Sequence, residues 1–488
     1  MWGQILIRGK VRIGTYTIPT GLTVLLSFYG CAAQSNASGG GSSNGSASSA
    51  SESSSTSTGS VAGGASSSSQ GGSASSASGS SGSTSSASTG ASTSSSSIAP
   101  APSCSLPSGG APTGNFPFPQ NKKLANCTYP TASNSTFVCN AYSSWYNGIT
   151  TTTGATSGRR VYDKTFDSGN TTSEGMGYGM LIAVYMGDKP TFDAFWQYVK
   201  SEFFNGLMGW HISSTGTALD QHSATDADED MAWALLMADK QWGGSPSSGG
   251  GTYLSSATSM INSIKSSEMT GNLPTDGDYS APVTHPDYAA PDYNAEFAMA
   301  SGDSSWNAVS AAEYAAFESA RNASSGLIPD ATTGTGNNIF GFDACRAPWR
   351  VGVDYCWHGN GTQTFGATQF LGPMMMTFQG LAGATYPGTL ELPLSLTGSP
   401  AAGATVTGTT TQPSLTGAIS GPAAVAAMMS SANQAFIDSS WTWLKTYMAR
   451  ATMSGIYGEY GDYFGSTLAL LAMIMLDGDF IDYTNPPP

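Results

Sequence analysis

The chain has 488 residues and a formal net charge of −15, from 17 basic and 32 acidic side chains. Only 10% of its residues are charged, against roughly a quarter in an average soluble domain. An acidic chain with few lysines lacks the positive surface that neutralises phosphates, so we expect no nucleic-acid partner. Its six cysteines and four histidines show no C-x-x-C and no H-x-x-x-H spacing, so we expect no metal and no other cofactor.

Residues 1–33 have the features of an export signal. Three basic residues stand within the first twelve positions, and the apolar stretch Leu22–Phe28 follows them. Gly-Cys31-Ala-Ala resembles a bacterial lipoprotein signal, although Phe28 stands where leucine is usual. We expect export, either as a cell-surface or outer-membrane lipoprotein with a lipid anchor at Cys31 or as a secreted protein.

Residues 34–103 are almost wholly Ser, Gly, Ala and Thr, with Glu52 as the only charged residue. Such a segment has too little apolar surface to offset its ordering entropy. We expect a disordered low-complexity linker with a reach of roughly 45–50 Å. The rest, 104–488, is rich in tryptophan and long enough for one large core, so we expect a single domain there.

Apolar residues at helical spacing predict an all-α fold for this domain. Strand-like alternation is scarce, and long loops such as 243–251 and 386–417 separate the helices. This pattern indicates helical hairpins packed in a ring or a stack. The predicted helices are Tyr178–Tyr185, Phe192–Phe204, Asp230–Trp242, Leu254–Met269, Asp292–Ala300, Ser310–Arg321, Ala344–Cys356, Gly421–Ile437, Ser440–Met448 and Gly465–Leu476.

The stretch Thr171-Thr-Ser-Glu174-Gly-Met-Gly-Tyr-Gly has two interpretations. Thr171 and Glu174 have the spacing of a capping box at the start of a helix. The three glycines oppose this interpretation, because each costs roughly 1 kcal/mol inside a helix. Glycines are usual where another backbone or a ligand approaches closely. The spacing is not that of a dinucleotide-binding motif.

Four acids, Asp226, Asp228, Glu229 and Asp230, come directly before an apolar helix. The helix dipole favours acids at such a position, and we interpret Asp228, Glu229 and Asp230 in this way. Because the four carboxylates repel one another, we expect at least one to face something other than solvent.

Asp343 and Arg346 open another apolar helix. Asp343 suits an N-cap, with Arg346 paired to it one turn later. The functional alternative is a carboxylate kept ionised by a nearby guanidinium, as a general base requires.

The cysteines predict disulfides only in part. Cys345 and Cys356 would lie roughly 16 Å apart along one helix, too far to be bridged. In an exported protein, Cys127 with Cys139, or Cys104 with either, are better candidates. If Cys31 carries a lipid, at least one of the remaining thiols stays free.

Taken in order, these stretches resemble glycoside hydrolase family 8. The resemblance covers roughly residues 115–484 and implies an (α/α)6 barrel. It also implies endo-acting cleavage of β-1,4-linked glucan, xylan or chitosan, or of mixed-linkage glucan. The matching motifs are Phe116-Pro-Phe-Pro-Gln120, Ser173-Glu-Gly-Met-Gly-Tyr-Gly-Met180, Asn205-Gly-Leu-Met-Gly-Trp210, Ala224-Thr-Asp-Ala-Asp-Glu-Asp230, Asp343-Ala-Cys-Arg-Ala-Pro-Trp-Arg350 and Asp477-Gly-Asp-Phe480.

On the matching positions, the resemblance implies Glu174 as the general acid and Asp343 as the general base. Asp226 would hold the distorted sugar at the cleavage point, and Arg346 would orient Asp343. An inverting enzyme needs the two carboxyl groups about 6.5–9.5 Å apart, with a water between base and sugar. The pKa of its general acid must be raised. The substrate-binding residues implied are Trp210, Tyr288, Arg346 and Tyr178.

Two positions bear on the substrate. Phe342 stands where a tyrosine is common beside the base, and Asp343 is often missing from the branches that cleave chitosan or lichenan. The presence of Asp343 favours the cellulase and xylanase branches. We therefore expect a monomeric, inverting endo-β-1,4-glucanase. The alternatives are an endo-β-1,4-xylanase of the same family and a non-catalytic carbohydrate-binding surface protein.

Overall fold

The computed structural model describes residues 104–487, apart from 165–166, 280–283, 335, 362–363, 383–389, 391, 402–412 and 454–462. The expected signal segment, its Cys31 and the expected linker 34–103 lie outside the described residues.

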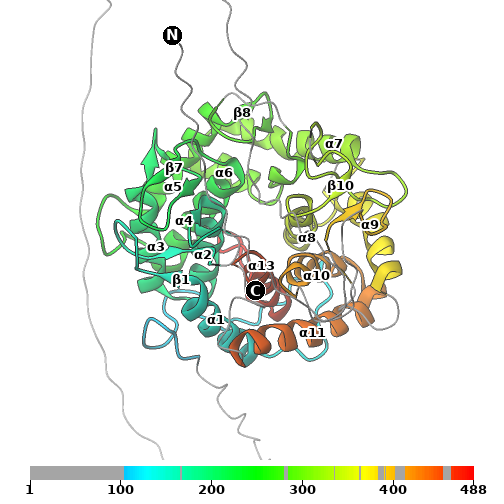
Figure 1. The fold of residues 1–488 in the computed structure, drawn as a ribbon, viewed down its shortest axis with the longest axis horizontal. Coiled ribbons are helices and arrows are strands. Elements are labelled where there is room, and N and C mark those ends of the chain that lie inside the picture. The colour runs from blue at the N-terminus through cyan, green and yellow to red at the C-terminus, as the bar shows by residue number, and fades with distance from the viewer. Residues whose placement is uncertain are drawn as a thin grey trace, which may run out of the picture. The chain divides into compact units, whose positions relative to one another are not determined.

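The described helices alternate between the outside and the inside of a ring (Figure 1). The inner helices α13 and α2 pack against each other, so the end of the ring meets its beginning. This arrangement confirms the predicted (α/α)6 barrel. The outer helices are α1 (Ser135–Ile149), α3 (Lys189–Ser201), α5 (Tyr253–Ser267), α7 (Val309–Ala320), α9 (Ala367–Ala382) and α11 (Gln434–Met453). The inner helices are α2 (Ser173–Tyr185), α4 (Thr225–Trp242), α6 (Asn294–Ser301), α8 (Ala347–His358), α10 (Pro413–Ala427) and α13 (Tyr463–Asp477).

Short antiparallel strands of two or three residues lie in the connections. One three-stranded ribbon shapes the site, because β3 leads directly into α2 and Trp210 directly precedes β6. The Ser173 amide donates to the Trp210 carbonyl over 2.9 Å, which fixes the start of α2 beside Trp210. The pairs are β1 (Thr150–Thr151) with β2 (Arg160–Val161), β3 (Thr171–Thr172) with β6 (His211–Ile212), β6 with β7 (Ala218–Asp220), β4 (Phe203–Phe204) with β5 (Leu207–Met208), β8 (Met269–Thr270) with β9 (Leu273–Pro274), and β10 (Ile339–Phe340) with β11 (Leu394–Ser395).

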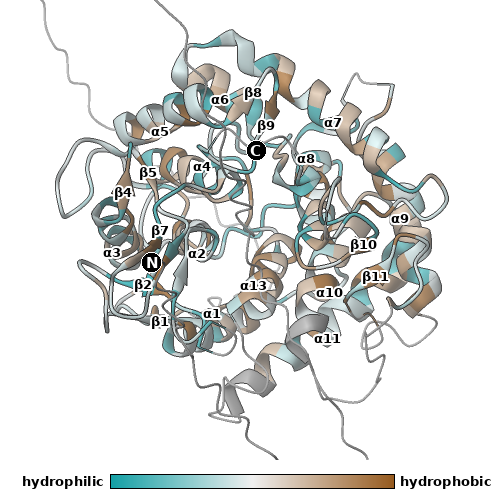
Figure 2. Cartoon of the chain, turned by 45° about the horizontal axis from the view of Figure 1, so that its top comes forward, coloured by the Kyte–Doolittle hydropathy of each residue, from teal (hydrophilic) through white to brown (hydrophobic). Residues whose placement is uncertain are grey.

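The core lies between the two layers of helices and inside the ring. In α13, every residue from Gly465 to Asp477 is buried, as expected for a helix that is apolar on all sides. Figure 2 shows this apolar character along α13 and α10, in contrast to the more polar outer helices α3 and α5. None of the described helices has the length and hydropathy needed to cross a membrane.

The glycines of α2 allow a close approach, as predicted. A Cβ atom on Gly177 would lie 3.0 Å from the Ala227 carbonyl oxygen and 3.0 Å from the Asp230 Cβ, both on α4. The predicted capping box is wrong: the N-cap is Thr172, whose hydroxyl accepts from the Gly175 amide over 3.2 Å. The Glu174 side chain is therefore available for other contacts.

Most predicted helices are present, but several boundaries are wrong and two helices were not predicted. The helices predicted to end at Phe204 and Met269 stop earlier, because Phe203–Phe204 form β4 and Met269 begins β8. The predicted helix Ser440–Met448 is the middle of α11.

The predicted helix Gly421–Ile437 is broken between α10 and α11, where the Asn433 amide group donates to the Ala427 carbonyl over 2.9 Å. Helix α9 was missed because it contains two internal glycines and Pro373. Helix α1 was missed because polar residues interrupt its apolar spacing.

Two disulfides join distant segments. The bond between Cys104 and Cys139 is one of the predicted alternatives. The bond between Cys127 and Cys356 was not predicted, and it ties the segment before α1 to the end of α8. Cys345 is buried and unpaired, and Cys345 and Cys356 do not pair, as expected.

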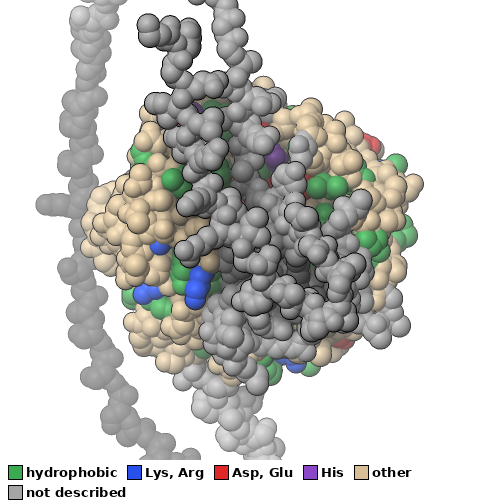
Figure 3. Space-filling model, viewed as in Figure 1, with side chains coloured by type: hydrophobic (Ala, Val, Ile, Leu, Met, Phe, Trp, Pro, Cys, Tyr) green, Lys and Arg blue, Asp and Glu red, His purple; other side chains and the backbone are tan. Residues whose placement is uncertain are grey.

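The acidic residues gather inside the domain. On the face drawn in Figure 3, the charged side chains that can be seen are few and scattered. Many carboxylates of the described residues are buried, at the site, on the inner helices and in the connections between helices. The net charge of the sequence therefore says little about the charge on the surface.

Candidate active site

The predicted acids come from the amino-terminal ends of inner helices. Glu174 and Asp226 are the second residues of α2 and α4. Asp343 directly precedes η3 (Ala344–Arg346), which leads into α8, and Tyr288 ends η1 (Pro286–Tyr288), the turn before α6. These helix ends meet on one side of the ring, so residues far apart in the sequence converge.

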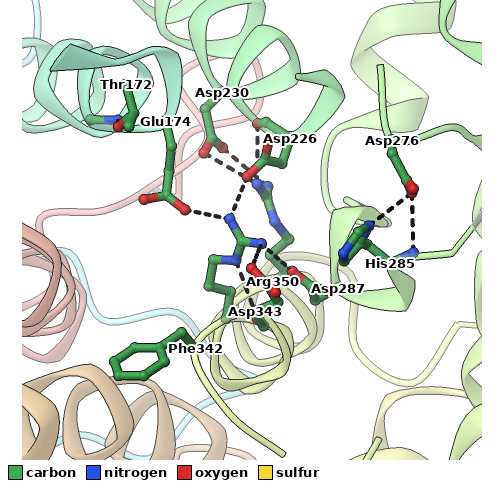
Figure 4. A network of polar contacts seen from close by, with 12 residues as sticks. Thr172, Glu174, Asp226, Asp230, Asp276, His285, Asp287, Phe342, Asp343 and Arg350 are labelled. Atoms are coloured by element: carbon green, nitrogen blue, oxygen red, sulfur yellow. Dashed lines mark hydrogen bonds and ion pairs between the residues drawn. The ribbon is translucent and has the colours of Figure 1, made fainter. Parts of the chain in front are cut away.

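Four acids, Glu174, Asp226, Asp287 and Asp343, point toward one another (Figure 4). The guanidinium of Arg346 contacts all four carboxylates. Its Nη1 donates to Glu174 Oε2 and, over 2.5 Å, to Asp226 Oδ2. Its Nη2 donates to Asp287 Oδ2 over 2.5 Å and to Asp343 Oδ1 over 3.1 Å. The planar fork of an arginine suits this role because it presents several fixed donors. The predicted pairing of Arg346 with Asp343 is confirmed, and Arg346 also joins the other three acids.

Glu174 is held at both carboxylate oxygens. The Tyr463 hydroxyl donates to Oε1 over 2.7 Å, while Arg346 contacts Oε2. Burial and the charges of Asp226 and Asp343 raise the pKa of Glu174 to about 7, against the opposing effect of Arg346 and Tyr463. A carboxyl group with this pKa is partly protonated near neutral pH, as a general acid must be.

Asp343 has the most accessible carboxylate of the four. Its side chain is 28% exposed, compared with 15% for Glu174, 2% for Asp226 and 0% for Asp287. The loop before it is held by Asp330 Oδ1, which accepts from the Gly341 amide over 2.7 Å and from the Ala344 amide over 2.9 Å. A fixed and accessible carboxylate suits a general base that must reach a water.

Asp226 and Asp287 each have one oxygen on Arg346 and one oxygen without a protein partner. These free atoms, Oδ1 in both residues, are buried and accept no hydrogen bond from the part of the chain that the structure describes. Burial raises the pKa of Asp287 to about 6, and the negative charge of Asp343 adds to the effect of burial. Buried acceptors without partners are costly, so each of these two oxygens needs a donor that the described residues do not supply.

A second arginine lies beneath the first. The two terminal nitrogens of Arg350 donate to the two carboxylate oxygens of Asp230 over 3.1 and 3.2 Å, and its Nη2 also donates to the Asp226 carbonyl over 3.2 Å. The Tyr293 hydroxyl donates to Asp230 over 3.0 Å. Arg350 therefore fastens the start of α4 to α8 and holds the backbone of Asp226.

All four acids at the start of α4 are buried, which confirms that at least one faces something other than solvent. The acids lie inside α4, which begins at Thr225, and not before the helix as predicted. Glu229 and Asp230 lie beyond its first turn, so the predicted interaction with the helix dipole does not explain them. Burial and the negative charge of Glu268 raise the pKa of Asp228 well above its ordinary value, and burial and the charge of Glu313 do the same for Glu229.

The predicted sugar-binding aromatics lie at different depths. Trp210 is half-buried and stacks on the His211 ring, with centroids 4.7 Å apart. Tyr288 is also half-buried, and the Arg346 guanidinium lies 5.3 Å from its ring centroid. Tyr178 is only 2% exposed and lies one turn after Glu174 on α2. Their contacts with substrate stay predictions.

Phe342, which stands where a tyrosine is common, packs against Phe464 with ring centroids 6.1 Å apart. It belongs to the apolar surroundings of the site, whereas the tyrosine hydroxyl that contacts a catalytic acid comes from Tyr463.

Sequence reasoning missed three residues of the site: Asp287, Asp330 and Tyr463. Asp287 adjoins Tyr288, so its position in the same motif was an available signal. Nothing local marks Asp330 or Tyr463, because each acts on a residue far away in the sequence. Among the residues that the structure describes, no three His, Cys, Asp or Glu side chains are placed to share a metal ion.

Comparison with known proteins gives the family. The model of glycosyl hydrolases family 8 matches residues 116–478. Endoglucanase C of Ruminiclostridium cellulolyticum is 36% identical over 263 residues, which are 50% of this chain and 56% of that relative, so the chain spans about half its length. A beta-glucanase of Niallia circulans is 29% identical over 377 residues, 70% of this chain and 84% of that protein.

Among solved structures, a β-1,3-1,4-glucanase of Paenibacillus sp. X4 superimposes with a TM-score of 0.64 at 26% identity. The superposition covers 75% of this chain and 99% of that structure. The ring of helices, the acids gathered at the ends of the inner helices and the match over residues 116–478 agree: the chain belongs to glycoside hydrolase family 8.

Proposed function

We propose that this protein is an inverting endo-acting hydrolase of β-1,4-glucan that uses Glu174 and Asp343 as acid and base. The observation that carries the proposal is the pair of carboxylates held by one arginine, one with a pKa of about 7 and the other accessible. The similarity to proteins named endoglucanase and beta-glucanase favours glucan over xylan.

In this mechanism, Glu174 donates its proton to the glycosidic oxygen while the bond from that oxygen to the anomeric carbon breaks. A water on the opposite face attacks the anomeric carbon and gives its proton to Asp343. Asp226, which contacts the same arginine, holds the distorted sugar at the cleavage point. Solvent then returns the proton from Asp343 to Glu174, so the cycle needs no cofactor.

The test is reducing-sugar release by Glu174→Gln and Asp343→Asn on carboxymethylcellulose, barley β-glucan, xylan and chitosan. Either change should lower activity by roughly 10²–10⁴-fold, because each removes a proton-transfer group. The exposed Glu318 on α7 supplies a matched control, Glu318→Gln, which should keep full activity. Variants within a few-fold of wild type would mean that the protein binds carbohydrate without this chemistry. A clear preference for xylan would change the substrate but not the mechanism.

We also propose that the protein is exported, with Cys31 as its lipid anchor and residues 34–103 as a flexible tether. The supporting features are the basic start, the apolar stretch and the Gly-Cys31 junction. Cell fractionation of wild type and Cys31→Ser tests the anchor. Wild type should fractionate with the membrane and Cys31→Ser should not; wild type found entirely in the medium would leave simple secretion.

A further inference from the structure

A histidine–aspartate pair lies beside the four-carboxylate site and takes no part in the mechanism above. His285 directly precedes η1, which carries Asp287 and Tyr288, and its Nδ1 lies 3.0 Å from Asp276 Oδ1. In Figure 4 the pair lies on the far side of Asp287 from Glu174. The His285 side chain is 24% exposed, so part of the ring is open to a ligand.

The contacts of Asp276 fix the orientation of the His285 ring. Asp276 Oδ1 also accepts from the backbone amides of Thr284 and His285, over 3.1 and 3.2 Å, and its Oδ2 accepts from the Thr284 hydroxyl. The same hydroxyl oxygen lies 3.3 Å from Nδ1. With acceptors on that side, the ring carries a proton on Nδ1 and directs its other nitrogen, Nε2, away from Asp276.

The charge of the ring follows from its neighbours. Burial lowers the pKa of His285, but the hydrogen bond to Asp276 and the charges of Asp287 and Asp343 raise it to about 9. At neutral pH both ring nitrogens therefore carry protons. In the described part of the chain, the hydrogen bonds of the His285 side chain are made through Nδ1, so Nε2 presents a charged donor without a partner.

The His285 imidazole packs on the ring of Tyr288, one of the predicted sugar-binding residues. The two rings are stacked, with centroids 5.1 Å apart and an angle of 26° between their planes. Tyr288 in turn lies against Arg346, which contacts both proposed catalytic carboxylates. The acids around Arg346 supply acceptors to a bound sugar, whereas His285 would supply a donor on the Tyr288 side.

We propose that His285 is a substrate-binding residue whose Nε2–H donates a hydrogen bond to a hydroxyl of the sugar bound on the Tyr288 side of the cleavage point, and that Asp276 positions it. This inference rests on the proposed function, since it takes a β-linked glucan as the ligand. The motif His285-Pro-Asp-Tyr288 would then contact the sugar through two side chains, those of His285 and Tyr288.

Binding is the direct test, measured by calorimetry with cellopentaose and xylopentaose on the full chain in the Glu174→Gln background. Adding His285→Ala should weaken binding by roughly 10- to 100-fold, as expected for loss of a hydrogen bond from a charged donor. Adding His285→Gln, which keeps a donor of similar reach, should recover part of the affinity. His358→Ala is the matched control, because His358 ends α8 away from the site.

The outcomes separate the two proposals. Binding within two-fold of the background for His285→Ala, with hydrolysis by the wild type, would overturn the role of His285 alone. No binding by the Glu174→Gln background and no hydrolysis by the wild type would overturn both. A merely structural role predicts equal losses for His285→Ala and His285→Gln, together with lowered melting temperatures.

The pH dependence gives a second readout. Asp276→Asn removes the hydrogen bond that contributes most to raising the pKa of His285, so the ring should lose its charge at a lower pH than in wild type, and affinity should fall earlier as the pH rises. The groups that face the ring are Asp276, Asp287, Asp343 and Tyr288, and only the first is changed. The comparison is between the Glu174→Gln protein and the same protein with Asp276→Asn added. If the ratio of their affinities does not change with pH, His285 does not act as a charged donor.

Discussion

Tyr463 and Glu174 are 289 positions apart in the sequence, yet the tyrosine hydroxyl donates a hydrogen bond of 2.7 Å to the carboxylate of the proposed general acid. Tyr463 is the first residue of α13 and Glu174 the second residue of α2, and these inner helices pack against each other where the ring of helices closes. This contact fixes the side chain of Glu174 and also lowers its pKa, in opposition to burial. The same hydrogen bond therefore joins the last inner helix to the first and lowers the pKa of the proposed general acid.

We predict that Tyr463→Phe raises the pKa of Glu174, because it removes a donor that favours the ionised form. Activity requires the protonated acid and is lost as the pH rises through a pKa of about 7. The alkaline limb of kcat/KM should therefore move upward by roughly one pH unit. Tyr314→Phe removes a similar donor from Asp354, outside the site, and should leave the limb in place. An unchanged or lowered limb for Tyr463→Phe would contradict the prediction.

Arg346→Lys should be far from conservative. A lysine ammonium cannot reproduce the planar fork that contacts four carboxylates, so at least one buried acid would lose its partner. We expect kcat to fall at least 100-fold and the free energy of unfolding to fall by about 3 kcal/mol. Steady-state kinetics and thermal unfolding measure the two effects. The control is Arg159→Lys, because the Arg159 guanidinium stacks on Tyr146 and contacts none of the four acids. Equal losses of kcat and stability in the two variants would contradict the prediction.

Asp330 is predicted to act on catalysis through Asp343. Asp330→Ala removes the acceptor for the Gly341 and Ala344 amides, and two buried donors would be left unpaired. The cost should be about 1–3 kcal/mol per donor, and the loosened loop should lower kcat more than it raises KM. Asp330→Asn keeps one carbonyl oxygen in place and should retain most of kcat. If both variants lose kcat equally, the charge of Asp330 matters rather than its position.

Much of the site was predictable from the sequence because several of its residues stand in short local motifs. Glu174, Asp226, Asp343 and Arg346 each stand in a run of unusual composition, and the structure brings all four together. Helices such as α13 and α4 were also predictable, since their apolar residues are continuous or strongly periodic.

What was missed depends on contacts between distant segments. Tyr463 gains its role only when α13 meets α2, and Cys127 gains its partner only when the segment before α1 reaches the end of α8. Helix α9 forms despite Pro373 because it packs against α8 and α10, and tertiary packing can override weak propensity. The raised pKa of Asp228 likewise depends in part on Glu268, which directly follows α5 and is 40 positions away in the sequence.

Stability should fall as the pH rises. Burial raises the pKa of Glu268 to about 8 and that of Asp228 well above its ordinary value, so the folded state holds protons that the unfolded state releases near pH 4. The stabilisation is complete below that pH and is lost as the pH rises toward 8. Asp228→Asn imitates the protonated acid and should reduce the drop in melting temperature between pH 5 and pH 9. If the melting temperature of Asp228→Asn drops as much as that of wild type, the Asp228 and Glu268 carboxyl groups do not hold these protons in the folded state.

In the proposed mechanism, Glu174 and Asp343 act on opposite faces of one glycosidic bond, with a water at Asp343. The most direct measurement is proton NMR of the anomeric signals during the first minutes of hydrolysis of a β-1,4-linked cello-oligosaccharide by the wild-type protein. Attack by water on the face opposite the leaving group predicts that the α-anomer appears first and the β-anomer grows in by mutarotation. If the β-anomer appears first, the reaction retains configuration, and Asp343 cannot be the general base that activates a water on the opposite face.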